Sequence, residues 1–353
     1  MQLLGLLIAG GVGAALCHLW PWRRPWAWTT ERDRLAREIQ VADRKSLDSL
    51  EMGRLLGSGS FGRVFRARWL GVNVAVKVID HKPGSHTISG CIEREAMIGV
   101  ATSHPNVVTC YRVMTQRGQS RGSGRQTLIL MELCDRDTLD RQAPRLWELQ
   151  RSSPAQGILH VIRCLIDIAA GLRFMHSVGV VHGDLKCQNI LCKSTRSDPR
   201  GFMCKIADFG LSKCLDAKRG EVPAVEPGSI LYAAPECLRT GKIRLHSDVY
   251  GFGMIAWHLV TPDSFENAMR DAQLWFSKCQ GDWRPALSED TPDDVSALIS
   301  SCWQECESRP SFLEIQARLE CLNATYSTQI ARCGSLRQQS SSDIGITHIQ
   351  QCV

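Results

Sequence analysis

The feature that most constrains the fold is a glycine-rich turn between two extended segments, with a third extended segment after it. Residues 55–64 are Leu-Leu-Gly-Ser-Gly-Ser-Phe-Gly-Arg-Val, and apolar residues alternate with arginines over 65–69, which is the period of a strand. A GxGxxG turn also occurs in dinucleotide-binding folds, and Asp80 lies where such a fold keeps its ribose-binding acid. That motif must open a helix, however, whereas a strand follows here. The sequence therefore argues against a dinucleotide fold.

A lysine lies in the middle of the third extended segment, residues 72–79. A buried ammonium needs a counter-charge, because an isolated charge is costly to remove from water. Lys77 therefore indicates a ligand phosphate or a carboxylate nearby, and Glu95 on the predicted helix 91–100 is the candidate. An exposed lysine on an edge strand is the alternative. Two more strands are predicted near 107–113 and 127–133, joined by a Gly-, Ser- and Arg-rich segment that is a solvated loop or a docking site.

A second group of polar residues occupies one short loop between apolar segments, Val-His-Gly-Asp-Leu-Lys-Cys-Gln-Asn-Ile-Leu over 181–191. Asp184 can accept a proton from a hydroxyl, Lys186 can neutralise a transferring phosphoryl group, and Asn189 can hold a magnesium ion. A helix is predicted before this loop over 158–176, strands around Ile190 and Ile206 after it, and further helices at 247–259 and through 274, 295 and 313. The loop is therefore suited to chemistry on a metal-bound phosphate.

Composition places the chain among globular proteins and limits its partners. Its 353 residues are 44% hydrophobic and 22% charged, with a mild net charge of +6 that argues against a dedicated nucleic-acid binder. The 16 cysteines form no CxxC pair, so no zinc-ribbon or redox signature is present. Scattered thiols of this kind fit a reducing compartment.

The amino-terminal residues predict a membrane anchor. Residues 3–20 are uncharged and mostly apolar, four tryptophans close or follow them, and several arginines come next. The positive-inside rule then leaves the rest of the chain in the cytosol. A cleaved signal peptide is the alternative, although such segments usually begin with a basic region. The predicted divisions are an anchor over 1–28, a juxtamembrane linker over 29–49 and, from its Ser-, Gln- and Thr-rich composition, a disordered tail over 323–353.

Taken in order, these features resemble the signature set of eukaryotic-type protein kinases over about residues 50–322. The matching residues are Gly57, Gly59, Gly62 and Val64, then Lys77, Glu95, His182, Asp184, Lys186, Asn189, Asp208-Phe209-Gly210, Ala234-Pro235-Glu236, Asp248 and Arg309. The resemblance implies an α+β, bilobal protein kinase fold after the anchor helix. Its small lobe of five strands and one helix covers 50–134, its larger helical lobe covers 135–322, and ATP binds in the cleft.

The resemblance also implies a role for each matching residue. Lys77, positioned by Glu95, grips the phosphates of ATP, while Asn189 and Asp208 bind Mg²⁺. Asp184 is the catalytic base, with Lys186 beside it. The implied ATP-binding residues are Leu56, Gly57, Ser58, Gly59, Ser60, Phe61, Gly62, Val64, Ala75, Lys77, Met131, Glu132, Cys134 and Leu191. Glu236 and Arg309 are expected to form a buried structural ion pair.

The implied reaction is transfer of the gamma-phosphate of ATP to Ser or Thr hydroxyls of protein substrates, since Lys186 is the serine/threonine-kinase form. The loop insert, the run Gly71–Ala75 and the missing arginine after His182 resemble the Mos group or its tyrosine-kinase-like neighbours. The alternative function is a pseudokinase acting as a membrane-tethered scaffold, which usually lacks one of the catalytic residues that are intact here. A receptor or adaptor function finds no recognisable ectodomain or docking module.

Two departures from the kinase pattern bear on regulation. Gly183 replaces an arginine that often pairs with a phosphorylated activation segment, and the only hydroxyl residues between Gly210 and Ala234 are Ser212, Ser229 and Tyr232. We therefore expect activity without phosphorylation of this segment. Gly99 lies one turn after Glu95, where the family keeps a bulky apolar residue. A glycine there would leave a cavity that loosens the helix, so we hypothesise that a homodimer or an activating partner holds the helix inward. This hypothesis fails if Gly99→Leu leaves basal activity unchanged.

Overall fold

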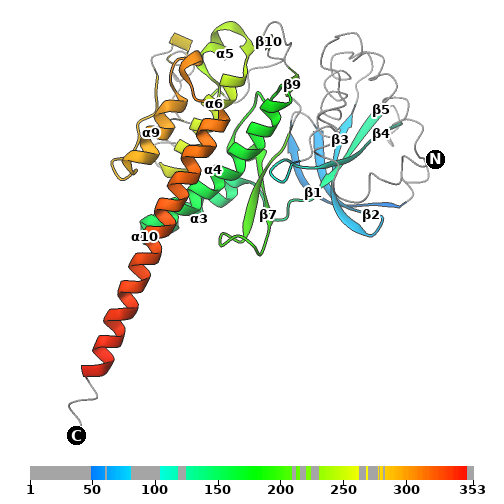
Figure 1. Cartoon of the computed structure of the whole chain (residues 1–353). Helices are drawn as coiled ribbons and strands as arrows, with labels where there is room; N and C mark the ends of the chain where they lie inside the picture. Colours follow the sequence, from blue (N-terminus) through cyan, green and yellow to red (C-terminus); the bar gives the residue numbers. More distant parts are fainter. Residues whose placement is uncertain are drawn as a thin grey trace. The chain divides into compact units, whose positions relative to one another are not determined.

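The computed structural model describes residues 49–59, 62–80, 104–117, 125–208, 212–214, 220–223, 230–261, 268, 277, 279–280 and 283–347. The chain divides into two compact units, each with its own elements (Figure 1). The sheet unit comprises residues 1–89 and 109–132, and the helical unit comprises residues 90–108 and 133–353. A β-rich part and a larger helical part are thereby confirmed.

The sheet unit contains one antiparallel sheet with the strand order β1-β2-β3-β5-β4. Its strands are β1 (Leu50–Gly59), β2 (Gly62–Trp69), β3 (Val72–Asp80), β4 (Cys110–Arg117) and β5 (Arg125–Glu132). Val74, Val76 and Val78 of β3 point into a small core with Leu128 and Leu130 of β5. These residues occur at every second position and so share one face of β3, while Ala75, Lys77 and Ile79 on its other face are buried as well.

The helical unit is built around two buried helices, α4 (Pro154–Ser177) and α6 (Leu245–Val260). Its other helices are α3 (Leu139–Ser152), α5 (Pro235–Thr240), α9 (Asp293–Cys302) and α10 (Phe312–Thr347), with 3₁₀ turns η2 (Cys187–Asn189) and η4 (Cys306–Ser308). Its short strands pair as β6 (Val180–Val181) with β9 (Lys213–Cys214), β7 (Ile190–Ser194) with β8 (Phe202–Ile206), and β10 (Val222–Pro223) with β11 (Lys242–Ile243). Side chains of α6 such as Trp257, Tyr250 and Phe252 are fully buried, which makes this helix the centre of the core.

The prediction of a disordered tail from Asn323 is wrong as far as Thr347, because α10 continues to that residue. Tyr326 is buried in the core of the helical unit, and Leu322 and Ile330 pack against the same core. Their spacing of four residues places all three on one side of a helix. The polar residues between them lower the mean hydropathy of the segment without removing this apolar stripe.

No helix among the residues that the structure describes is long and apolar enough to cross a bilayer. Residues 1–48, which hold the predicted anchor and almost all of the linker, lie outside the described residues. The anchor therefore stays a prediction from sequence.

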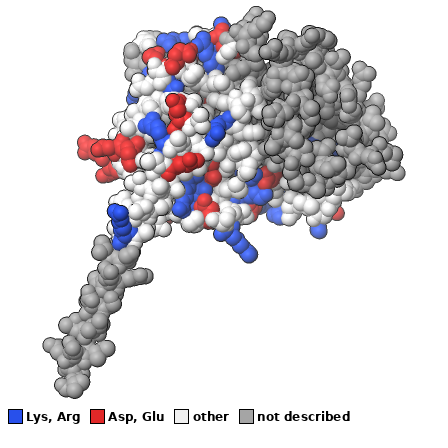
Figure 2. Space-filling model, viewed as in Figure 1, with Lys and Arg blue, Asp and Glu red and all other residues white. Residues whose placement is uncertain are grey.

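Acidic and basic side chains are interspersed over the described part of the face drawn in Figure 2. At physiological ionic strength, salt screens the field of exposed charges beyond about 8 Å. The described part of this face therefore has no broad field of one sign.

Candidate active site

The loop that carries Asp184 is fixed from within by His182, whose side chain is fully buried. Gly179, with φ +72, ends α4 and turns the chain into β6, from which the loop starts. The backbone N–H of Asp184 donates to His182 Nδ1 at 3.2 Å, and His182 Nε2 lies 3.0 Å from the carbonyl oxygen of Ala207. Since Nδ1 accepts, Nε2 carries the proton and donates to Ala207. The imidazole is thus a structural link to the residue before Asp208.

A buried carboxylate on α6 holds the same loop from outside. Asp248 accepts hydrogen bonds from the backbone N–H groups of His182 at 2.8 Å and Gly183 at 2.9 Å, and its Oδ2 lies 2.9 Å from His176 Nε2. Gly183 has φ +80, a conformation that glycine adopts at little cost. The sequence analysis names Asp248 among the residues that match the kinase signature but assigns it no role. Its hydrogen bonds now make it the residue that sets the backbone of the loop.

The three predicted catalytic-loop side chains are brought together by these constraints. Asp184 Oδ2 accepts from Lys186 Nζ at 2.7 Å and from Asn189 Nδ2 at 3.0 Å. Asn189 Nδ2 also donates to the backbone carbonyl of Asp184 at 2.8 Å. Asp184 and Asn189 are buried, whereas the Lys186 side chain is 25% exposed. The carboxylate is therefore oriented by two donors beside an accessible ammonium.

The β7–β8 hairpin places the two predicted metal ligands at the same end of the hairpin. Ile190 pairs with Ile206, and the backbone N–H of Ala207 donates to the carbonyl of Asn189 at 2.9 Å, so Asp208 follows next to Asn189. Asp208 has φ +63, a left-handed conformation that is uncommon outside glycine and tends to occur at functional sites. An amide oxygen and a carboxylate are the hard ligands that magnesium prefers. The donor types at this end of the hairpin therefore fit Mg²⁺.

The glycine turn of the sheet unit is the link between β1 and β2. Gly57 pairs with Val64, and Gly59 pairs with Gly62 across the turn. Gly62 has φ +128, and a Cβ atom there would lie 2.5 Å from the carbonyl oxygen of Val78. Only glycine fits this position without a shift of the β3 backbone. Ser60 and Phe61, also predicted to bind ATP, lie outside the described residues.

Lys77 lies in β3, opposite Val64 of β2 and Ile129 of β5, and is 6% exposed. The strand order puts β3 inside the sheet, so the alternative of an exposed lysine on an edge strand is wrong. Glu95, its predicted partner, lies outside the described residues. The Lys77–Glu95 pair therefore stays a prediction.

The predicted adenine-binding residues are placed in both units. In the sheet unit, Ala75 pairs with Met131, and Glu132 donates its backbone N–H to the carbonyl of Thr109 at 2.9 Å. In the sheet unit Leu56 and Ser58 are exposed and Val64 and Met131 half-buried, and in the helical unit Cys134 and Leu191 are half-buried.

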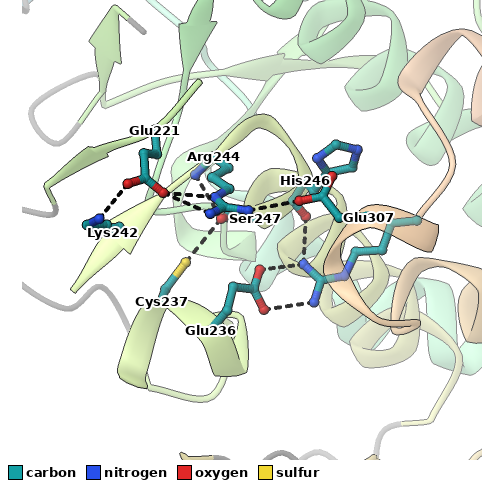
Figure 3. Close-up of polar contacts among 9 residues, drawn as sticks. Glu221, Glu236, Cys237, Lys242, Arg244, His246, Ser247 and Glu307 are labelled. Atoms are coloured by element: carbon teal, nitrogen blue, oxygen red, sulfur yellow. Dashed lines mark hydrogen bonds and ion pairs between the residues drawn. The ribbon is translucent and has the colours of Figure 1, made fainter. Parts of the chain in front are cut away.

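The predicted structural ion pair of the helical unit is confirmed (Figure 3). Arg309 donates from Nη1 to Glu236 Oε1 at 2.6 Å and from Nη2 to Oε2 at 2.9 Å, with the arginine side chain 2% exposed. Burial on its own would raise the pKa of Glu236, but the hydrogen bonds and charge of Arg309 outweigh it and lower this pKa. The pair joins α5 to the segment before α10.

Comparison with known proteins decides the family. Residues 50–319 match the family described as protein tyrosine and serine/threonine kinase. The chain belongs to this family. The kinase is 32% identical to a light-sensor protein kinase of Ceratodon purpureus, over 76% of this chain and 21% of that protein. It is 29% identical to a dual specificity protein kinase of Dictyostelium discoideum, over 77% of this chain and 34% of that protein. A second dual specificity protein kinase of Dictyostelium discoideum is 28% identical, over 77% of this chain and 11% of that protein.

The chain thus covers 11% to 34% of the length of these relatives. What the similarity describes is the kinase domain. Two residues of the site could not be assigned a role from sequence, His176 and Asp248, because their hydrogen bonds join segments about 70 positions apart.

Proposed function

We propose that the kinase transfers the gamma-phosphate of ATP to Ser or Thr hydroxyls of protein substrates. The observation that carries this proposal is the arrangement of Asp184, Lys186 and Asn189, in which one carboxylate is held by two donors. An oriented carboxylate is suited to accept the proton of a hydroxyl that attacks a phosphate. The form of the loop with Lys186 supports serine and threonine over tyrosine as acceptors.

In this mechanism Asp184 orients the substrate hydroxyl and takes its proton, while the Lys186 ammonium offsets charge on the transferred phosphoryl group. Both side chains are positioned before substrate arrives, so little reorganisation is needed during transfer. Asp248 and His182 hold the loop backbone and touch no reacting atom.

ATP and Mg²⁺ are the implied ligands, and the residues present fit them. Asn189 and Asp208 would hold the metal, which when bound neutralises phosphate charge. The glycine turn and Lys77, with Glu95, would hold the phosphates. Val64, Ala75 and Leu191 would contact adenine beside Met131, with backbone groups of Glu132 and Cys134 bonding its edge.

The test is transfer of labelled gamma-phosphate to a generic protein substrate by the wild type and by Asp208→Asn. We expect the substitution to lower the rate by about 100-fold or more, since it removes a metal ligand and its charge. Asp293→Asn is the matched control, because Asp293 is exposed on α9 and bonds nothing in the site. A wild type that binds ATP without transferring phosphate would establish the pseudokinase alternative.

We also propose that residues 1–28 anchor the kinase in a membrane with its domain in the cytosol, and that the chain is related to the Mos or tyrosine-kinase-like group. The first proposal rests on the apolar segment, its tryptophans and the arginines that follow. The full chain should stay with membranes after alkaline extraction, while a chain lacking residues 1–28 should be released. Glycosylation at Asn323 would instead place the domain on the luminal side.

A further inference from the structure

The segment between the predicted metal ligand Asp208 and Glu236, here named the activation segment, is attached at both ends within the helical unit. Near its start, β9 pairs with β6, and Ser212 Oγ donates to the carbonyl of His182 at 3.1 Å. At its end, Glu236 pairs with Arg309. Its middle is attached by β10, in which Val222 pairs with Ile243 of β11.

Glu221, the residue before β10, adds a charged attachment at this middle point (Figure 3). Its Oε1 accepts from Lys242 Nζ, and its Oε2 accepts from Arg244 Nη2 at 2.8 Å and Nε at 3.2 Å. Each carboxylate oxygen therefore has its own cation. These hydrogen bonds, first from Lys242 and then from Arg244, lower the pKa of Glu221, so the side chain stays ionised near neutral pH.

Arg244 connects this attachment to the catalytic loop. It is the N-cap residue of α6, and its backbone N–H donates to Ser247 Oγ at 3.0 Å. Its Nη1 also donates to Glu307 at 2.8 Å, so the guanidinium is held from two sides. Asp248 in the same first turn bonds the backbone of the catalytic loop. The activation segment and the loop are thus attached to one helix end.

The hydroxyl groups of this segment that the structure describes already have structural partners. Ser212 is buried and bonded to His182, and Tyr232 is buried with its hydroxyl 2.9 Å from His258 Nδ1. Ser229 lies outside the described residues. Gly183 has no side chain, so it cannot provide the positive charge with which an arginine at this position would bind a phosphate. A negative charge on the segment is nevertheless present, at Glu221.

We propose that Glu221 is a positioning residue that takes the place of an activation-segment phosphate, with Lys242 and Arg244 as its receptor. The inference rests on the proposed phosphoryl transfer. A phosphate carries nearly two charges and three acceptor oxygens, and a glutamate supplies one charge and two oxygens without any modifying enzyme. Strand β10, which follows Glu221, then stays paired with β11 without phosphorylation, and this attachment favours binding of the protein substrate.

The test uses the full chain and Glu221→Gln, which keeps the shape of the side chain and removes its charge. We expect kcat/KM for the protein substrate to fall about tenfold, with the KM for ATP changed by less than about twofold. Glu307→Gln is the matched control, because it removes a carboxylate from the same guanidinium but not from the activation segment. It should change kcat/KM by less than about twofold.

Arg244→Gln and the double variant Glu221→Gln/Arg244→Gln complete a double-mutant cycle. If the two charges act together, the double variant loses little more activity than either single variant. Additive losses would show that the two charges act independently. An equal fall in kcat/KM for ATP and for the protein substrate, together with a lower melting temperature, would assign Glu221 a structural role only. Either result would overturn the inference. Phosphatase-treated wild type should stay active, and its inactivation would also overturn it. A wild type without any transfer contradicts the proposed function instead.

Discussion

At the scale of single residues, the glycines of the turn between β1 and β2 are required for different reasons. A Cβ atom at Gly62 would meet the carbonyl oxygen of Val78 at 2.5 Å, and its φ of +128 lies outside the range that other residues favour. A Cβ atom at Gly57 would have nothing within 4 Å. Gly62 is therefore needed for the fold, and Gly57 is free to serve a ligand.

We expect Gly62→Ala to lower the free energy of unfolding by about 1–3 kcal/mol, because the new methyl group must displace the β3 backbone. Gly57→Ala should change this free energy by less than about 0.5 kcal/mol and should raise the KM for ATP by crowding the phosphates. Urea unfolding and initial-rate kinetics on both variants separate the two roles. Equal destabilisation by the two substitutions would contradict this division.

The roles of the loop residues could be predicted from residue types and spacing, but their support could not. Asp184, Lys186 and Asn189 lie within six residues of one another, so a single turn of the chain is enough to bring them together. Asp248 reaches the same loop from a helix more than 60 positions away, and His182 bonds Ala207 across 25 positions. Contacts of that kind depend on packing, which local patterns do not encode.

At the scale of elements, a strong hydrophobic period was sufficient to predict a helix from the sequence, and a weak one was not. The five strands of the sheet unit and helices α4 and α6 are predicted from the sequence, the two helices by their apolar pattern and β1 only by the glycine turn that follows it. Helix α3 is missing from the predictions, because it carries Pro144 and many polar residues. Its buried Leu139, Ala143 and Leu146 do have helical spacing and supplied a usable signal.

The β10–β11 pair shows what sequence patterns cannot supply. Each strand has only two residues, and the charges that join them, Glu221 with Lys242 and Arg244, are about 20 positions apart. Surface ion pairs have no period and no distinctive composition. Only the register Val222 to Ile243 brings these side chains together, and register depends on the tertiary fold.

At the scale of the whole molecule, acid stability depends on a histidine buried in the core of the helical unit. His258 on α6 is 2% exposed and lies 2.9 Å from the hydroxyl of Tyr232. Burial lowers the pKa of His258 from 6.5 to about 4, because the charged ring would lose its hydration. Below pH 6.5, His258 therefore binds a proton in the unfolded chain but stays neutral in the folded protein until the pH falls to about 4.

The sign of the effect follows from this difference in proton binding. Above pH 6.5 His258 is neutral in both states and contributes no pH dependence, whereas between pH 6.5 and about 4 only the unfolded chain is protonated. The free energy of unfolding should then fall by up to about 1.4 kcal/mol per pH unit across this window.

Urea unfolding at pH 7.5 and pH 5.0 should show this loss for the wild type and a smaller one for His258→Asn, which keeps a polar atom for Tyr232. Some slope will remain, because burial also lowers the pKa of His104 and His160. The control is His246→Asn, at a half-buried position on the same helix, and the slope should fall more in His258→Asn than in this variant. An unchanged slope in His258→Asn would mean that the acid sensitivity of the fold arises elsewhere.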